Sequence, residues 1–336
     1  MPVFRFALLA VALLSTLPAQ AQPYPVQIEG RYGFIDASGA VVIEPRFERV
    51  QGFSEDRAAV QIGGAWGFID RQGEVVVPAE YETVGRFVEG RARVQQAGTW
   101  GFIDPAGTVV VPLTFTQALD FQEGLAGVER AERRLGLILR RAWGFIDRDG
   151  TWQLEPQFES VQQFAEARAP VEVSERLAFI KVGSRWGFAD ASGTLVIAPT
   201  YQTARGFSSG LALVLRDGVP GFIDYEGTLR FTVEADQLYP FQDGLARFGR
   251  AGQWGFLDQD GATAIPPRFD QALDFSEGLA AVQQGDQWGY IDREGQYALL
   301  PQFDRARPFE GPLAAVVLNG RAAYIDQTGQ VVWQGE

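Results

Sequence analysis

The chain has 336 residues, of which 46% are hydrophobic and 21% charged, a composition typical of a folded globular protein. Its formal net charge of −13 argues against nucleic acid or an anionic membrane surface as a general partner, because both attract basic proteins. The chain has neither cysteine nor histidine, which excludes disulfides, thiolate metal sites, histidine-dependent triads and the usual zinc ligands.

Residues 1–21 have the pattern of a secretory signal peptide. One positive charge, at Arg5, precedes an apolar run of about a dozen residues, which is short for a membrane span. Small residues at Ala19 and Ala21 then form a cleavage pattern. We therefore expect cleavage near Ala21 and export to the periplasm or the cell exterior. No later apolar run is long enough to predict a membrane span.

Residues 22–336 repeat one unit nine times. Each copy has a phrase close to Trp-Gly-Phe-Ile-Asp, and neighbouring copies lie 34 residues apart, except for two intervals of 43. The aspartates that end the phrase are Asp36, Asp70, Asp104, Asp147, Asp190, Asp224, Asp258, Asp292 and Asp326. Such a period predicts a repeat architecture before any single element is assigned.

Other positions keep the same register. A glycine follows each of these aspartates by three residues. In the first eight copies an aromatic residue follows by eleven except at Ala235, a phenylalanine by seventeen and an alanine by twenty-two. The pattern resembles the bacterial WG-repeat (KWG) family of secreted or surface-linked proteins. This resemblance implies a β repeat and carries no common reaction. The chain departs from the pattern at Tyr32, Pro220 and Ala322, where tryptophan is missing, and at Ala323, where glycine is missing.

Each unit is predicted to contain three antiparallel strands. In the copy that begins at Gly278, strands are expected near residues 279–283, 288–292 and 296–301. The aspartate that ends the phrase is expected to accept hydrogen bonds from the amides that follow it, and the glycine three residues later to take a positive φ. In the connector, Phe47, Val50 and Phe53 are spaced by three, which favours a short turn or 3₁₀ piece.

The predicted fold is an all-β tandem array of nine three-stranded antiparallel units of about 34 residues, because one such unit alone buries too little surface to be stable. We expect the units to form an open superhelical stack. A closed β-propeller is the alternative, since nine blades would be unusual. The glycine beside tryptophan and the repeated alanine are expected to let neighbouring units approach closely.

The repeated tryptophans and aspartates each allow two interpretations. The tryptophans could form a platform for sugars or Pro-rich peptides, or they could pack between units. The aspartates could bind calcium or act in catalysis, or they could close turns. We favour packing and turn formation, because the phrase offers too few oxygen ligands for calcium and no known catalytic motif. No catalytic, cofactor-binding or metal-binding residue is predicted.

The two longer intervals predict extended hairpins near residues 128–142 and 171–185, in adjacent units. They are expected to project on the same side and to form a basic, apolar protrusion on an acidic protein, although they could also pair with each other or be tolerated surface variation. The candidate partner-binding residues are Arg130, Arg133, Arg134, Leu137, Ile138, Arg140, Arg141, Arg176 and Lys181. Loops that depart from a rigid scaffold often carry function.

The expected function is that of an exported, non-enzymatic binding or scaffold protein that engages a protein or a cell-envelope polymer. The alternative is a carbohydrate-binding or carbohydrate-active protein that uses exposed tryptophans and carboxylates. A third possibility is a structural spacer. No cofactor, nucleic acid or membrane span is expected.

Overall fold

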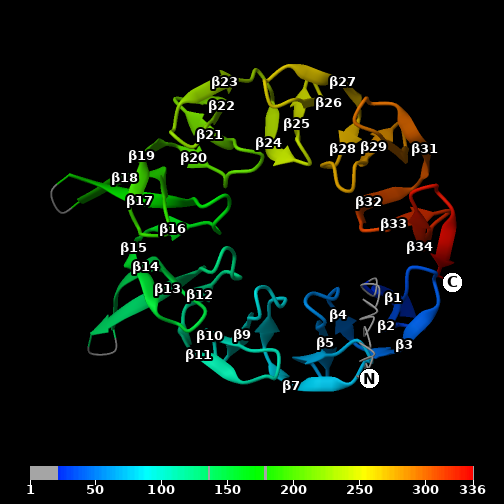
Figure 1. The fold of residues 1–336 in the computed structure, drawn as a ribbon, viewed down its shortest axis with the longest axis horizontal. Coiled ribbons are helices and arrows are strands. Elements are labelled where there is room, and N and C mark those ends of the chain that lie inside the picture. The colour runs from blue at the N-terminus through cyan, green and yellow to red at the C-terminus, as the bar shows by residue number, and fades with distance from the viewer. Residues whose placement is uncertain (1–21, 135–136, 178–179, 336) are drawn as a thin grey trace, which may run out of the picture.

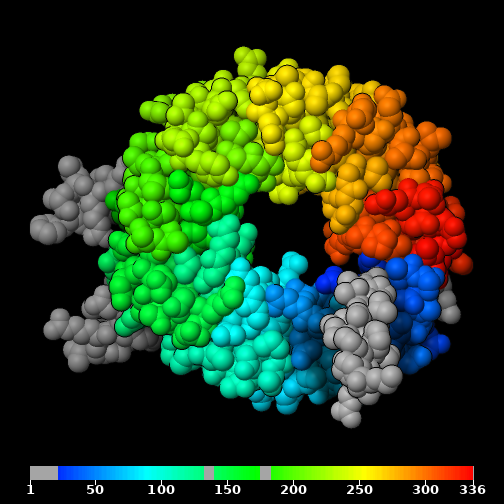
Figure 2. Space-filling model, in the orientation of Figure 1, coloured from blue at the N-terminus to red at the C-terminus, as the bar shows by residue number. Residues whose placement is uncertain are grey.

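The computed structural model describes residues 22–134, 137–177 and 180–335, so the predicted signal peptide lies outside the described part. These residues form 35 strands and no helix, and hence no helix that could cross a membrane. The strands build nine small antiparallel sheets, which Figure 1 shows as the blades of a closed ring. Figure 2 shows that side chains leave an opening at the centre of the ring. The protein is therefore a nine-bladed β-propeller.

Blades are numbered here in chain order. The first three blades contain β1 (Tyr24–Ile28), β2 (Arg31–Ile35) and β3 (Val41–Phe47); β4 (Arg49–Val50), β5 (Ala58–Ile62), β6 (Ala65–Ile69) and β7 (Val75–Tyr81); and β8 (Thr83–Val84), β9 (Ala92–Gln96), β10 (Thr99–Ile103) and β11 (Val109–Phe115). The next three contain β12 (Gln117–Ala118), β13 (Ala126–Arg134), β14 (Leu137–Ile146) and β15 (Trp152–Phe158); β16 (Ser160–Val161), β17 (Ala169–Leu177), β18 (Ile180–Ala189) and β19 (Leu195–Tyr201); and β20 (Thr203–Ala204), β21 (Ala212–Arg216), β22 (Val219–Ile223) and β23 (Leu229–Thr232).

The last three blades have the same order. They contain β24 (Gln237–Gln242), β25 (Leu245–Arg250), β26 (Gln253–Leu257) and β27 (Thr263–Phe269); β28 (Gln271–Ala272), β29 (Ala280–Gln284), β30 (Gln287–Ile291) and β31 (Tyr297–Phe303); and β32 (Arg305–Glu310), β33 (Leu313–Leu318), β34 (Arg321–Asp326) and β35 (Val331–Gln334). In every blade each strand pairs with the next strand along the chain, so each blade is a meander.

The predicted open stack is wrong, because the first and last blades pack against each other. The Tyr24 hydroxyl donates to the Glu310 carbonyl at 3.0 Å, and the Tyr324 hydroxyl donates to the Pro25 carbonyl at 3.0 Å. The two tyrosine rings lie 5.5 Å apart within one hydrophobic cluster, which also includes Val26 and Leu313. These contacts close the ring between β1 and the ninth blade.

The prediction of three strands per unit is also incomplete. The connector contributes a short fourth strand to eight of the nine blades; in the second blade this is Arg49–Val50, which pairs with Gln61 and Val60 of β5. The predicted turn or 3₁₀ piece is therefore a two-residue strand, and the connector runs on into a tight hairpin marked by a bridge between Ser54 and Arg57. Only the first blade lacks such an inner strand among the described residues.

The core lies between blades rather than within them. Each hydrophobic cluster combines residues of one blade with residues of the next: Phe68 and Tyr81 of the second blade pack with Phe87, Val94 and Ile103 of the third. The third residue of the repeated phrase meets the connector phenylalanine in eight inter-blade aromatic pairs, with ring centroids 4.8–5.0 Å apart. Such pairs stabilise a core beyond the area that they bury.

The predicted aspartate turn is confirmed. In the first copy, Oδ1 of Asp36 accepts the N–H groups of Ser38 at 2.8 Å and Ala40 at 3.0 Å. Gly39, which has φ +87°, donates its N–H to the Asp36 carbonyl at 3.1 Å. The repeated aspartate thus holds the turn between the last two strands of its blade.

Candidate functional site

The two long hairpins are the largest departure from the regular ring. β13 and β14 form one hairpin and β17 and β18 the other, and Figure 1 shows both projecting outward on the same side of the ring. The two hairpins belong to separate sheets, and their described strands do not pair with each other. Residues 126–146 include five arginines and two glutamates, so this hairpin is basic on an acidic protein.

Three of the predicted site residues have described side chains. Arg130, Arg140 and Arg141 are all exposed. Nη2 of Arg140 donates to the Gln157 carbonyl at 3.3 Å, which tethers this side chain to the outer strand of its own blade. The side chains of the other candidates, Arg133, Arg134, Leu137, Ile138, Arg176 and Lys181, lie outside the described part of the structure.

The bases of the hairpins show how the ring accommodates the extra length. In the regular second blade, the Glu48 carboxylate accepts the N–H groups of Gly63 and Gly64 in the short turn between β5 and β6. In the long hairpins the turn lies farther along the chain, out of reach of the equivalent residues, Thr116 and Glu159. The Thr116 hydroxyl donates instead to Glu129, and the Ser174 hydroxyl donates to Glu159. Each long hairpin is therefore held to its connector at its base by a side-chain hydrogen bond.

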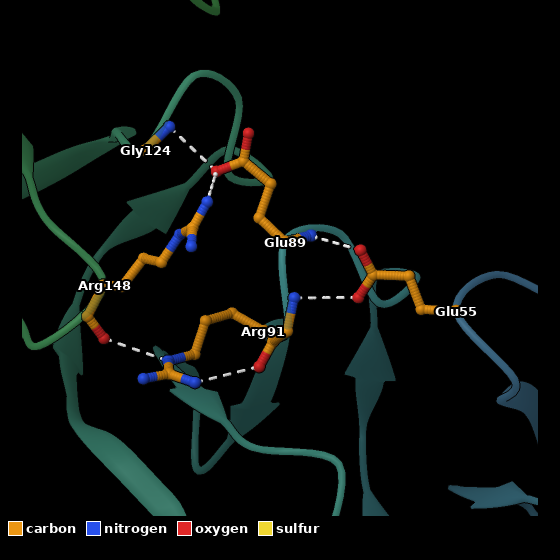
Figure 3. A network of polar contacts seen from close by, with 6 residues as sticks. Glu55, Glu89, Arg91, Gly124 and Arg148 are labelled. Carbon is orange, nitrogen blue, oxygen red and sulfur yellow. Dashed lines mark hydrogen bonds and ion pairs between the residues drawn. The ribbon is translucent and has the colours of Figure 1, made fainter. Parts of the chain in front are cut away.

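A ladder of carboxylates joins neighbouring blades on the connector hairpins (Figure 3). Glu55 accepts the N–H groups of Glu89 at 2.6 Å and Gly90 at 2.8 Å, and Glu89 in turn accepts the N–H of Gly124 at 2.8 Å and Nη2 of Arg148 at 2.8 Å. The same contact recurs at Glu123, Glu166, Asp243 and Glu277. These acids bind backbone amides of the next blade, so their role is structural.

Electrostatics agree with this role at Glu89. Burial raises the pKa of Glu89, but the hydrogen bonds from Arg148 and Gly124 lower it more, and the pKa ends below its ordinary value. The carboxylate is thus held in its charged form. Among the described residues no group of three or more acidic side chains is placed to hold a metal ion.

The six phrase tryptophans pack between blades. Trp100 and Trp254 are buried, with 7% and 8% of their surfaces exposed, and Trp66, Trp143, Trp186 and Trp288 are half-buried against the inter-blade clusters. They are placed as packing elements, which was the interpretation that the strand pattern favoured.

The glycine beside each tryptophan has a different role from the predicted one. A Cβ at Gly67 would lie 2.4 Å from the Val77 carbonyl oxygen of the same blade, where β7 bulges over β6. This glycine therefore admits a strand of its own blade. The approach of neighbouring blades falls instead on the turn glycine: a Cβ at Gly73 would lie 3.0 Å from Cγ2 of Ile43 in the preceding blade.

Two clefts lie where tryptophan is missing from the phrase. One, of about 330 Å³, is lined by Pro220 of β22, Ala235, and Leu238 of β24. The other, of about 700 Å³, lies between the first and ninth blades and includes Tyr32 and Ala322 among its lining residues. Sequence reasoning noted the missing tryptophans without predicting these cavities. The combined loss of tryptophan at 220 and of the aromatic residue at 235 was the available signal.

Comparison with solved structures gives distant matches, of which two are described. Apo AztD from Citrobacter koseri is 11% identical, with a TM-score of 0.42 and coverage of 94% of each chain. The uncharacterized protein lmo1340 from Listeria monocytogenes EGD-e is also 11% identical, with a TM-score of 0.42 and coverage of 76% of this chain and 94% of the other. These similarities carry no argument about function. No curated protein sequence matches the chain.

The sequence profile of the WG containing repeat matches seven segments. They are residues 32–64, 66–100, 100–131, 143–175, 186–219, 254–288 and 288–321, which together cover well over half of the chain. The unmatched stretches include the copies with Pro220 and with Ala322 and Ala323, where the phrase has lost its tryptophan. The chain belongs to the WG-containing repeat family.

Proposed function

We propose that this protein is an exported, non-enzymatic binding protein that uses its two long hairpins to hold a partner presenting anionic groups, either a protein surface or a cell-envelope polymer. The observation that carries the proposal is the exposure of Arg140 and Arg141 on a hairpin that projects from an otherwise acidic ring. Arginine suits this role because its planar, permanently charged head forms paired hydrogen bonds with carboxylates and phosphates.

The ring supplies rigidity and the hairpins supply reach. Neighbouring blades are joined by aromatic pairs and carboxylate-to-amide hydrogen bonds, so the hairpins rise from a fixed base. A local basic patch on a protein of net charge −13 would select partners by complementary charge and would bind more weakly at high salt.

A graft and a charge reversal test this proposal. Replacing residues 130–141 and 173–184 each by Gln-Ala-Gly, the sequence of residues 96–98 in the third blade, restores the short hairpin in both blades. The variant should keep its circular dichroism spectrum and lose retention on a heparin column, heparin serving as the anionic probe. The double variant Arg140→Glu/Arg141→Glu should lose retention as well.

The matched control is Arg216→Glu, because Arg216 is an exposed arginine at the end of β21 in a blade with a short hairpin. This control should elute with the wild type. Equal retention of the wild type and of the grafted variant at low salt would reject the hairpins as the binding element.

The alternative of glycan binding rests on exposed aromatic residues. The phrase tryptophans are buried or half-buried, which leaves the half-buried Tyr32 and Trp333 beside the cleft between the first and ninth blades as candidates for sugar stacking. Saturable binding on a glycan array that disappears in Trp333→Ala would favour this alternative.

A further inference from the structure

Among the described residues, the cleft between the first and ninth blades is the inter-blade junction that lacks both an inner strand and a phrase tryptophan. At the other junctions a short inner strand of the following blade fills the space, as Thr83–Val84 does between the second and third blades. At this junction β1 is the innermost described strand, and Ala322 stands where six other copies have tryptophan. The two losses together leave a cleft of about 700 Å³, against about 330 Å³ beside Pro220.

The edge of β1 beside this cleft corresponds to an edge that is paired elsewhere. In the second blade, the carbonyls of Gln61 and Ala59 accept N–H groups from the inner strand and its flanks, at 3.1 and 2.9 Å. Gln27 and Pro25 are the equivalent residues of β1, because they lie 34 residues earlier. The Pro25 carbonyl accepts the Tyr324 hydroxyl, whereas no described strand pairs with the edge at Gln27.

A proline at this edge is compatible with strand addition. Pro170 holds the position in the fifth blade equivalent to Pro25, and its carbonyl accepts the N–H of Gln162 at 3.0 Å beside the inner strand β16. At the first blade the Pro25 carbonyl already accepts the Tyr324 hydroxyl, so Gln27 is the residue that would supply a donor and an acceptor to an added strand.

The chain itself shows which side chain fits such a position. In most blades the second residue of the inner strand is a small, buried valine or alanine; these are Val84, Ala118, Val161, Ala204, Ala272 and Ala306. The inner strand β24, which follows the blade where Pro220 replaces tryptophan, has a different residue at this position. There the residue is Leu238, whereas β32, which is equally long but follows a blade with Trp288, has Ala306 at this position. The missing tryptophan at Pro220 is thus matched by a larger apolar side chain on the inner strand of the next blade.

We infer that the cleft between the first and ninth blades binds an extended peptide strand of a partner. The strand pairs with β1 at Gln27 and inserts a leucine-sized apolar side chain beside Ala322, in the manner of β24. Addition of a strand to an open sheet edge is a common mode of peptide recognition, in which backbone hydrogen bonds give affinity and side-chain pockets give specificity. This inference concerns a different surface from the basic hairpins and stands independently of them.

The experiment measures binding of a fluorescent peptide with the sequence of residues 236–243, Asp-Gln-Leu-Tyr-Pro-Phe-Gln-Asp, to the chain that begins at Gln22. Fluorescence anisotropy should show saturable binding. The same peptide with aspartate in place of its leucine should bind at least about tenfold more weakly, because a charge would then enter an apolar site.

Two pairs of protein variants separate the cleft from the strand edge. Ala322→Trp fills the cleft with the residue that six other copies carry at this position, and it should abolish binding, whereas Pro220→Trp fills the other cleft and should leave binding unchanged. Gln27→Pro removes the backbone donor from the open edge and should weaken binding by about tenfold, the scale of one lost hydrogen bond. Gln27→Ala keeps the donor and should bind as the wild type does.

Melting curves of all four variants check that the ring stays folded. The inference fails if the peptide shows no saturable binding, if Gln27→Pro binds it as well as Gln27→Ala does, or if Pro220→Trp loses as much affinity as Ala322→Trp. The inference would also be overturned if the protein bound a glycan but no peptide, and if Ala322→Trp abolished the binding of that glycan.

Discussion

At the scale of single residues, the glycine of the repeated phrase is set by the outer strand of its own blade. Where the phrase has glycine, as at Gly67, the outer strand shifts register and crosses it closely. In the ninth blade Ala323 takes this place, and the outer strand pairs evenly there, with Ala323 opposite Gln334 and Tyr324 opposite Trp333. Every blade with this bulge therefore has the glycine, although the sixth blade keeps Gly221 while its outer strand pairs evenly there.

Gly67→Ala is expected to destabilise the ring, because the new Cβ would lie 2.4 Å from the Val77 carbonyl oxygen, a clash with backbone that cannot relax cheaply. Overpacking of this kind costs about 1–3 kcal/mol. Urea unfolding followed by tryptophan fluorescence measures the loss. Gly52→Ala is the control, since nothing lies within 4 Å of its Cβ position. Equal midpoints for the two variants would contradict this account of the repeated glycine.

The carboxylates that join blades and those that hold the turns predict how stability depends on pH. The folded pKa of Glu89 lies below its ordinary value, as do those of Asp36, Asp190 and Asp326, whose largest cause is the hydroxyl two residues later. A carboxyl whose pKa is depressed by folding stabilises the protein above its unfolded pKa of about 4 and loses that contribution as pH falls through the folded value. The melting temperature should therefore fall between pH 6 and pH 3.

Glu89→Gln should lower the melting temperature at pH 7, because Gly124 and Arg148 lose their charged acceptor. The difference between this variant and the wild type should shrink towards pH 3, where Glu89 of the wild type is protonated too. Glu294→Gln, at an exposed turn position, should follow the wild-type curve throughout. A gap between Glu89→Gln and the wild type that stays constant with pH would argue against a role for the charge of Glu89.

At the scale of elements, the sequence predicted three strands of each blade well and the fourth poorly. The phrase and its flanks alternate over five to seven residues, long enough for a period of two to be visible, and the turn aspartate and glycine mark the boundary. In six blades the inner strand has only two residues, such as Arg49 and Val50 in the second blade, so it offers no alternation at all. Phe53, three residues after Val50, lies in the hairpin that follows the inner strand, and the apolar spacing of three therefore suggested a turn and not a strand.

The aromatic pairs between blades predict that neighbouring elements are coupled. Phe68 of the second blade and Phe87 of the third are 1% exposed each, and their ring centroids lie 4.8 Å apart. Each change to alanine should destabilise the ring by about 3–5 kcal/mol. A double-mutant cycle by chemical denaturation should give a coupling of about 0.5–1.5 kcal/mol, the value of an aromatic pair beyond its burial. Strictly additive losses would show that the two rings contribute independently.

At the scale of the whole molecule, the period shows that the units stack, but it does not show whether the stack closes. Closure depends on a small rotation per unit, which no single position of the repeat reveals. The residues that close the ring gave no such signal: Tyr24 takes the place of the repeated alanine, and Tyr324 holds the third position of the phrase, which is aromatic in all nine copies. The candidate sites were likewise predicted only in part. The long hairpins are visible in the sequence as a break in the period, whereas the clefts depend on how neighbouring blades pack, which the sequence does not show.

The tyrosine pair at the junction should control closure. Burial raises the pKa of Tyr324 to about 12, so its hydroxyl remains a donor to Pro25 at physiological pH, while Tyr24 bonds to Glu310 from the opposite side. Tyr24→Ala/Tyr324→Ala removes both rings and both hydrogen bonds. It should raise the radius of gyration in small-angle scattering and speed hydrogen exchange in β1 and β33 to β35, because these strands gain solvent when the first and ninth blades separate.

Tyr24→Phe/Tyr324→Phe keeps the rings and removes only the hydroxyls, so each lost hydrogen bond should cost about 0.5–1.5 kcal/mol while the ring stays closed. Exchange in β14 and β18, on the other side of the ring (Figure 1), should be unchanged in both double variants at low denaturant. If the alanine variant gave the same scattering curve and the same exchange at the junction as the wild type, the remaining cluster around Val26 and Leu313 would be sufficient for closure. The tyrosines would then contribute stability to the ring without determining its closed shape.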